Sequence, residues 1–402
     1  MESLISGLSE RERDRRYSLV RKEMKRSSID CLIITGYSGR WNEMNANVRY
    51  VSNYADNLST VSYVLIPLEG EPIYITQMTL KRSAAMISWI KDMRPESTTK
   101  APQIMEERLS NVGLRSGRVG LVGAGFSNGE VIGMPYNIFQ ELTRRLPNIE
   151  LVEMTETFTR LRMIKGEEEL RLIRKSAELC DLAFEEGVRL ARPGIRENEW
   201  FAGIHRLLYA HGCEQPSFLI GASGPMPTDN PSLMKNDPIY SSRVVKPGDV
   251  IISEFGPKVD GYAAQSLQMI CLRPAEPFLR TMAKYTVDIY KKVESELGPR
   301  KNVGEILQVG QSFMREVEPQ LGAQAQALTP IIHLIGMGGP DPSPSNACEG
   351  MELEKGMTLM IEVGNMSQQP VYSWLGTAFE ITDTGSKSLT RIAYEDRALK
   401  VV

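Results

Sequence analysis

The sequence predicts an α+β protein of two domains, and three observations lead to this fold class. Short apolar strands alternate with helices over roughly the first 150 residues. Residues 155–212 then have a helical pattern without strands. The rest is rich in strands and turns, interrupted by helix patterns at 277–297 and 303–321. Alternation is typical of an α/β domain, whereas helices followed by strands indicate an α+β domain with a curved antiparallel sheet.

The elements of the first half follow from local patterns. Residues 11–28 carry charges around a thin apolar stripe, which predicts a surface helix. Residues 61–76 contain two β-branched and aromatic runs joined by Leu-Glu-Gly-Glu, which predicts a hairpin. The other expected elements are strands at 30–36, 118–126 and 149–154 and a helix at 135–146.

The second half begins with two predicted helices. Pro193 and Gly194 end the first helix, and the acidic turn at 197–199 starts the second. The strands expected after them are SFLIGAS, DVIISEFG, YAAQSLQMICL, IIHLIGM, MTLMIEVGN and TAFEITDTG. The composition changes near 155, so we expect a smaller domain at 1–155 and a larger one at 156–402.

Composition excludes several classes of protein. A hydrophobic fraction of 42% and a charged fraction of 24% are typical of soluble globular proteins. The net charge of −3 gives no reason to expect nucleic acid or a membrane surface as a partner. Neither a signal peptide nor an apolar run of about 18 residues is evident. The five cysteines have no metal-binding spacing, which favours a reducing cytoplasm.

Several motifs in the second half occur in an order that resembles one protein family. They are RLRMIKGEEELRLIRKSAELCDLAFEEG with RPGIRENE, KPGDVIISEFGPKVDGYAAQS, IIHLIGMGGPDP, GMTLMIEVGNM and GTAFEITDTGSKSLT. This series resembles the creatinase/aminopeptidase P/prolidase family (M24), over nearly the whole chain. The resemblance implies a pita-bread catalytic domain, a smaller creatinase-type α/β N-terminal domain, and a homodimer.

Metallo-members of that family bind two divalent metals through Asp, Asp, His, Glu and Glu. Carried over by this resemblance, the first four positions fall on Glu254, Gln265, His333 and Glu362. The last falls on Gly376 by a gapless match, or on Glu380 by the G-x-x-x-E spacing. The second histidine of the peptidase members corresponds to Pro340.

These substitutions disfavour a two-metal centre. Bridging carboxylates must offset four positive charges about 3.5–4 Å apart. Gln265 offers only a neutral amide oxygen, which suits one hard cation but is a poor bridge. We therefore expect no metal cofactor and assign no metal ligand. A single weakly bound divalent cation stays open.

Glu254, His333 and Glu362 are the candidate catalytic residues. Two neighbouring carboxyl groups can hold different protonation states near neutral pH, and an adjacent imidazole can move protons. Metal-free creatinase and ectoine hydrolase belong to the same family. By that resemblance Glu254 is the nucleophile or base, Glu362 the acid or an anchor for a substrate cation, and His333 a carbonyl-polarising or proton-shuttling group.

Other polar and aromatic residues are candidates for binding substrate. Creatinase has a catalytic histidine before the KGD motif, and its position falls here near Asp229 or Asp237. Aromatic side chains of the later loops can line a pocket, although core packing explains them equally well. The full set is Gln265, Asp229, Asp237, Tyr262, Tyr372, Trp374 and Glu380.

The function expected from the sequence is metal-independent hydrolysis of a C–N bond in a small non-protein compound, such as an amide, an amidine or a cyclic amidine. The first alternative is a metal-dependent Xaa-Pro peptidase. The others are a binding module without catalysis and a lyase that uses the same cleft. The expected partner is a small-molecule substrate, with neither nucleic acid nor membrane involved.

Overall fold

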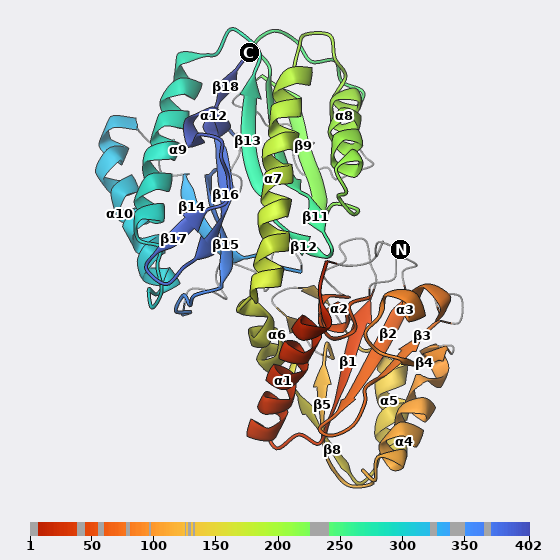
Figure 1. The fold of residues 1–402 in the computed structure, drawn as a ribbon. Coiled ribbons are helices and arrows are strands. Elements are labelled where there is room, and N and C mark those ends of the chain that lie inside the picture. The colour runs from red at the N-terminus through yellow and green to blue at the C-terminus, as the bar shows by residue number, and fades with distance from the viewer. Residues whose placement is uncertain are drawn as a thin grey trace. The chain divides into compact units, whose positions relative to one another are not determined.

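The chain forms two compact units in a computed structural model, Met1–Glu168 and Glu169–Val402 (Figure 1). Each unit has its own large sheet. The structure describes residues 7–37, 45–54, 60–77, 81–95, 98–124, 126–127, 130–131, 133–225, 241–321, 328–337, 350–365 and 371–402.

The first unit is built on a six-stranded mixed sheet with the order β4-β3-β2-β1-β5-β8. β1 pairs antiparallel with β2 and parallel with β5, and β2 and β3 form the hairpin predicted at 61–76. The strands are β1 (Cys31–Tyr37), β2 (Val61–Pro67), β3 (Ile73–Thr76), β4 (Asp92–Pro95), β5 (Gly117–Val122) and β8 (Ile149–Glu153), beside the short pair β6 (Phe126–Ser127) and β7 (Glu130–Val131).

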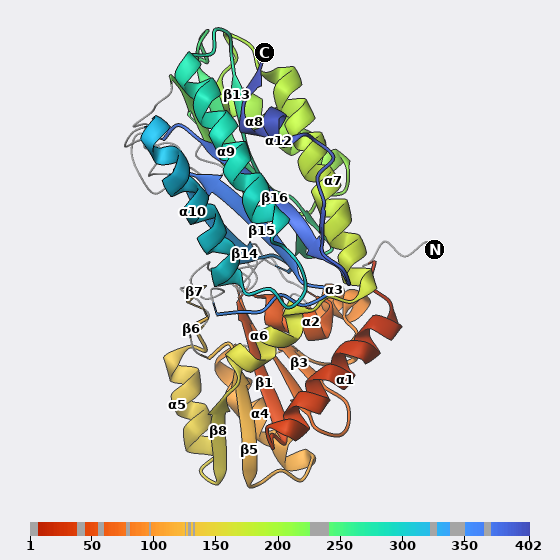
Figure 2. The same ribbon diagram turned by 90° about the vertical axis from the view of Figure 1, so that its left-hand side faces the viewer.

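Helices cover both faces of this sheet (Figure 2). On one face, Met105 and Leu142 of α4 and α5 pack with Ile33 and Leu65 of the strands. On the other face lie α1, α2 and α6, which begins the link to the second unit. The helices are α1 (Glu10–Arg26), α2 (Ala46–Ser52), α3 (Lys81–Ile87), a 3₁₀ turn (Thr98–Lys100), α4 (Ala101–Asn111), α5 (Tyr136–Arg145) and α6 (Thr155–Met163).

The helical stretch at 155–212 contains three helices instead of the two expected. α6 ends before Ile164, whose backbone is extended, and α7 (Glu167–Leu190) begins after Gly166. A Cβ at Gly166 would lie 2.9 Å from the Nε of Arg15, so a side chain has no room there. α8 (Glu197–Ala210) starts at the acidic turn, as predicted.

The second unit is built on an eight-stranded sheet, and its main path runs β14-β15-β16-β13-β10-β9. Neighbours on this path are antiparallel, while β17 pairs with β16 and β18 runs parallel to β13. The strands are β9 (Phe218–Gly224), β10 (Val250–Gly256), β13 (Ser266–Cys271), β14 (Thr329–Leu334), β15 (Thr358–Gly364), β16 (Trp374–Ile381), β17 (Ser386–Ser388) and β18 (Lys400–Val401), with the small hairpin β11 (Lys258–Val259) and β12 (Tyr262–Ala263).

Long helices cover one face of this sheet (Figures 1 and 2). The ring of Trp200 in α8 lies 6.0 Å from that of Phe255 in β10. The hydroxyl of Tyr290 in α9 (Pro277–Ser295) lies 2.6 Å from that of Thr377 in β16. α10 (Val303–Leu321) and the short α12 (Tyr394–Ala398) complete the helices of this unit. Among the described residues, no helix has both the length and the apolar character needed to span a bilayer.

Candidate functional site

Four strands of the second sheet carry one row of residues across its middle. Glu254 of β10 pairs with Leu267 of β13, Leu267 with Gly376 of β16, and Gly376 with Glu362 of β15. Directly paired residues in antiparallel strands project from the same face of a sheet. Glu254 and Glu362 therefore share one face, with Leu267 and Gly376 between them.

This face of the sheet is the one opposite the helices. Side chains alternate along a strand. Phe255 and Thr377, the neighbours of Glu254 and Gly376, point toward α8 and α9. The row of Glu254 and Glu362 consequently points away from that helical layer.

His333 joins Glu362 on this face. Its Nε2 lies 2.9 Å from Oε1 of Glu362, and its Nδ1 lies 3.0 Å from the backbone oxygen of Leu334. Burial by itself would lower the pKa of His333, but the hydrogen bond and charge of Glu362, together with the Leu334 carbonyl, outweigh it. The pKa of His333 is therefore raised, and Glu362 and His333 act as one hydrogen-bonded pair.

Glu254 is almost completely buried on β10. Burial raises its pKa well above the ordinary value of a glutamate, and the charge of Glu362 raises it further. Glu362 itself keeps 19% of its side chain exposed. The two carboxyl groups thus occupy different environments, one buried and one partly exposed, and burial favours the protonated form of Glu254.

Gln265 directly precedes β13, two residues before Leu267, so continuing the alternation of the strand by one residue places it on the same face. Its side chain is 3% exposed. Its Oε1 has no hydrogen-bond partner in the described part of the chain. A buried carbonyl oxygen without a partner is costly, so this atom is a candidate to contact a ligand.

The register distinguishes Gly376 from Glu380. Gly376 is the residue directly opposite Glu362, whereas Glu380 is opposite Thr358, further along β16. Glu380 accepts two hydrogen bonds from Arg174 of α7, 2.9 Å from Nε and 2.8 Å from Nη2. The structure therefore does not bring Glu380 together with Glu362 and His333.

The three aromatic candidates are all buried, but in different ways. Tyr262 donates a hydrogen bond to Oε1 of Glu169 at 2.7 Å, so its hydroxyl is already used within the fold. Tyr372 packs edge-on against Phe278, with ring centroids 5.4 Å apart. Trp374 lies two residues before Gly376, on the face of the row, and its indole nitrogen has no partner among the described residues.

Two candidate residues lie where the structure gives no description, and one residue of the row was not among the candidates. Asp229 and Asp237 lie outside the described residues, as does Pro340. Sequence reasoning did not select Leu267, although it follows Gln265 by two residues and occupies the centre of the row. Alternation along the strand predicts its face, but its pairing with Gly376 depends on a register that the sequence does not reveal.

The side chains at the five positions carried over from the metallo-members do not fit a two-metal centre. Gln265 carries no charge, and Gly376 carries no side chain opposite Glu362. The Nε2 of His333 is hydrogen-bonded to Oε1 of Glu362. Among the residues that the structure describes, no three His, Cys, Asp or Glu side chains are grouped so that they could hold one ion. Two divalent ions require shared carboxylates, which these positions do not supply.

Comparison with models of known protein families identifies the family of this chain. The model described as "Metallopeptidase family M24" matches residues 171–385, and the "Creatinase/Prolidase N-terminal domain" model matches 16–164. The chain belongs to metallopeptidase family M24. Its fold is a pita-bread domain preceded by a smaller N-terminal domain, which confirms the predicted family and fold class.

Relatives and solved structures agree on this fold. An Xaa-Pro dipeptidase of Pyrococcus horikoshii is 22% identical over 92% of this chain and 95% of its own length. The prolidase structure from Pyrococcus horikoshii OT3 has a TM-score of 0.75 at 20% identity, covering 95% of this chain and 99% of that one. An X-Pro aminopeptidase structure from Thermotoga maritima has a TM-score of 0.79 at 17% identity, covering 96% and 99%.

These findings correct two expectations from the sequence. Hydrolysis of a small non-protein C–N compound is contradicted, because the full-length relative is an Xaa-Pro dipeptidase and the similar structures are a prolidase and an X-Pro aminopeptidase. The expected absence of a metal cofactor is contradicted by a family described as metallopeptidases. Both errors have one cause. Losing the charge at Gln265 removes a bridge between two ions, but it leaves other donors in place for a cation.

Proposed function

We propose that this chain is a peptidase of the M24 type that hydrolyses the Xaa-Pro bond of short peptides. The observation that carries the proposal is the row itself, with buried Glu254 facing the same side of the sheet as the His333–Glu362 pair. Its alignment with an Xaa-Pro dipeptidase over 92% of the chain supports the choice of substrate. A homodimer and a cytoplasmic location stay predictions.

Glu254 is the group that we assign to the leaving nitrogen. The nitrogen of proline in a peptide bond carries no hydrogen, so it must gain a proton as the C–N bond breaks. The raised pKa of Glu254 keeps this carboxyl protonated to higher pH than an ordinary glutamate. This role as an acid differs from the nucleophile or base expected from the sequence.

The His333–Glu362 pair is assigned to the other side of the scissile bond. The hydrogen bond of 2.9 Å fixes the orientation of both side chains. Glu362 is the more open of the two, with 19% of its side chain exposed against 9% for His333. We therefore assign Glu362 to contact with the attacking water, and His333 to holding that carboxylate in place.

The test of this proposal is a comparison of matched dipeptides. The purified chain is assayed on Ala-Pro and Ala-Ala, both after removal of metal and with added Mn²⁺. We expect proline to be released from Ala-Pro and little alanine from Ala-Ala. Failure to cleave Ala-Pro and other Xaa-Pro dipeptides under both conditions would refute the assignment of substrate.

A further inference from the structure

A single apolar side chain lies between the two carboxyl groups of the row. Leu267 of β13 pairs directly with Glu254 of β10 on one side and with Gly376 of β16 on the other. Gly376 in turn pairs with Glu362 of β15. Neighbouring strands are about 4.8 Å apart, so three spacings separate the backbones of the two glutamates by roughly 14 Å. A substrate held between the two glutamates must therefore lie over Leu267 and Gly376.

Leu267 covers more of the sheet than its own position on β13. A Cβ built on Gly376 would lie 2.8 Å from Cδ1 of Leu267 and 3.3 Å from Cγ of Glu362. The side chain of Leu267 therefore leans over β16, toward the stem of Glu362. Because Gly376 contributes no side chain, the methyl groups of one leucine cover the sheet across two strands.

The leucine lies deeper in the protein than the carboxyl groups on either side of it. Leu267 is fully buried, whereas 19% of the side chain of Glu362 is exposed. Glu254 lies between these extremes, with an exposed fraction of 9%. The deepest point of the row is thus apolar. A substrate group that lies against it must be apolar as well, because methyl groups cannot replace the hydrogen bonds that a polar group makes with water.

The leaving side of the substrate is the side nearest to this leucine. Glu254, which we assign to the leaving nitrogen, is the direct partner of Leu267, whereas Glu362 lies two strands away from it. In an Xaa-Pro bond the leaving nitrogen is part of the saturated ring of proline. Packing such a ring against methyl groups removes apolar surface from water, which is favourable.

We propose that Leu267 limits the ring size of the amino acid that follows the scissile bond. This assignment rests on the proposed peptidase activity and specifies its leaving group. A five-membered proline ring packed on Leu267 has its nitrogen beside Glu254. The six-membered ring of pipecolic acid has one more methylene, for which the leucine leaves no room. One methylene in an apolar site changes kcat/KM by roughly 10–200-fold.

The first test compares two dipeptides that differ by one methylene. Ala-Pro and Ala-pipecolic acid are assayed with the wild-type chain and with Leu267→Ala. We expect wild type to favour Ala-Pro in kcat/KM by about tenfold or more, and this preference to fall by about tenfold in the variant. Because both substrates are assayed on one preparation, the ratio does not depend on the folded fraction. A ratio that stays at the wild-type value would overturn the assignment.

Ile270→Ala is the matched control for this variant. Ile270 is a fully buried residue of the same strand, and its Cδ1 lies 3.4 Å from a Cβ built on Gly187 of α7, on the helix-covered face. Its truncation should lower thermal stability and leave the ratio of the two substrates unchanged. An equal fall of the ratio in both variants would contradict the role of Leu267. If Leu267→Ala does not fold, Leu267→Val makes the same test with a smaller expected fall.

Binding without turnover separates this assignment from the proposed activity. Calorimetry measures the Kd of free proline and of free pipecolic acid, which are the two leaving groups. Wild type should bind proline more tightly by roughly tenfold, and Leu267→Ala should bind the two equally. If wild type cleaves neither dipeptide but shows this difference in binding, the peptidase activity fails and the role of Leu267 stands. Equal affinity of wild type for the two, or binding of neither, refutes the role of Leu267 whether or not Ala-Pro is cleaved.

Discussion

Two buried glutamines on opposite faces of the second sheet differ in their hydrogen bonding. On the face covered by helices, Gln268 donates hydrogen bonds of 3.0 Å to the backbone and hydroxyl oxygens of Ser253. Its own Oε1 accepts from Arg397 at 2.9 Å. On the opposite face, Gln265 and Trp374 each have a buried polar atom without a partner in the described residues. Gln268 is thus paired within the fold, whereas the unpaired oxygen of Gln265 is available to a ligand.

The same contrast holds for the buried charges. Asp181 of α7 is paired with the fully buried Arg397, and it also accepts hydrogen bonds from Thr390 and the backbone of Arg391. No comparable cation lies beside Glu254 in the part of the chain that the structure describes, and its pKa is raised by burial and by Glu362. Stability and activity are thus expected to depend on opposite faces of one sheet. Substitutions on each face test that division.

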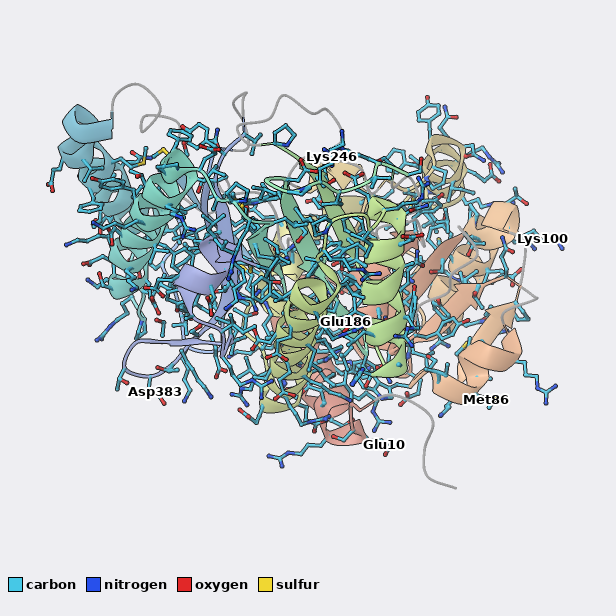
Figure 3. The ribbon with its side chains drawn as sticks, turned by 90° about the horizontal axis from the view of Figure 1, so that it is seen from above. Glu10, Met86, Lys100, Glu186, Lys246 and Asp383 are labelled. Atoms are coloured by element: carbon cyan, nitrogen blue, oxygen red, sulfur yellow. The ribbon has the colours of Figure 1, made fainter. Side chains whose placement is uncertain are left out.

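The largest expected effect is on turnover. Glu254→Gln keeps the shape of the side chain but cannot deliver a proton, so kcat on an Xaa-Pro dipeptide should fall by about 10²–10⁴. The measurement is steady-state kinetics on Ala-Pro. Asp383→Asn is the control, because Asp383 lies at the outer surface (Figure 3) with 73% of its side chain exposed. If Glu254→Gln turned over at the wild-type rate, Glu254 would not be the acid.

The next effect is on stability and concerns the helix-covered face. Arg397→Met leaves the buried carboxylate of Asp181 with only the exposed Arg391, whose Nε lies 3.6 Å away, which should lower the free energy of unfolding by about 3 kcal/mol. Urea unfolding measures this change. The double variant Arg397→Met/Asp181→Leu removes both charges and should recover most of the loss. No recovery would mean that packing against Phe184, 5.0 Å away, is the larger contribution of Arg397.

The sequence could predict Glu254, His333 and Glu362 as candidates but not the residues that surround them. Glu254, His333 and Glu362 stand out because each is an ionisable residue in an apolar strand, and such residues need a partner or a function. The contact of Leu267 with the space over Gly376 depends on strands distant in the sequence. Strand pairing is fixed by the whole sheet, so a local pattern cannot predict it. The break at Gly166 was missed for the same reason, since Arg15 closes that space from another helix.

A smaller effect follows from the raised pKa of Glu254. An acid whose pKa is raised by folding stabilises the protein fully below its unfolded pKa, about 4.3, and this contribution is lost as pH rises through the folded pKa. Each unit of pKa difference is worth about 1.4 kcal/mol. Glu254→Gln should therefore make the metal-free chain more stable than wild type at pH 8, with a smaller difference at pH 4. Urea unfolding at both pH values measures this, and a gain that does not depend on pH would point to another cause.

The smallest effect concerns Glu380. Its substitution tests two ways of locating the active site on β16: the strand register selects Gly376, whereas the G-x-x-x-E spacing selects Glu380. Arg174→Met breaks the ion pair with Glu380, but Arg174 is 33% exposed, so the free energy of unfolding should fall by only about 1 kcal/mol. Glu380 lies four residues beyond Gly376, roughly 13 Å along the strand at about 3.3 Å per residue. Glu380→Gln should therefore leave kcat on Ala-Pro unchanged. A large loss of kcat in Glu380→Gln, with the fold intact, would move the site along β16 and contradict the row centred on Gly376.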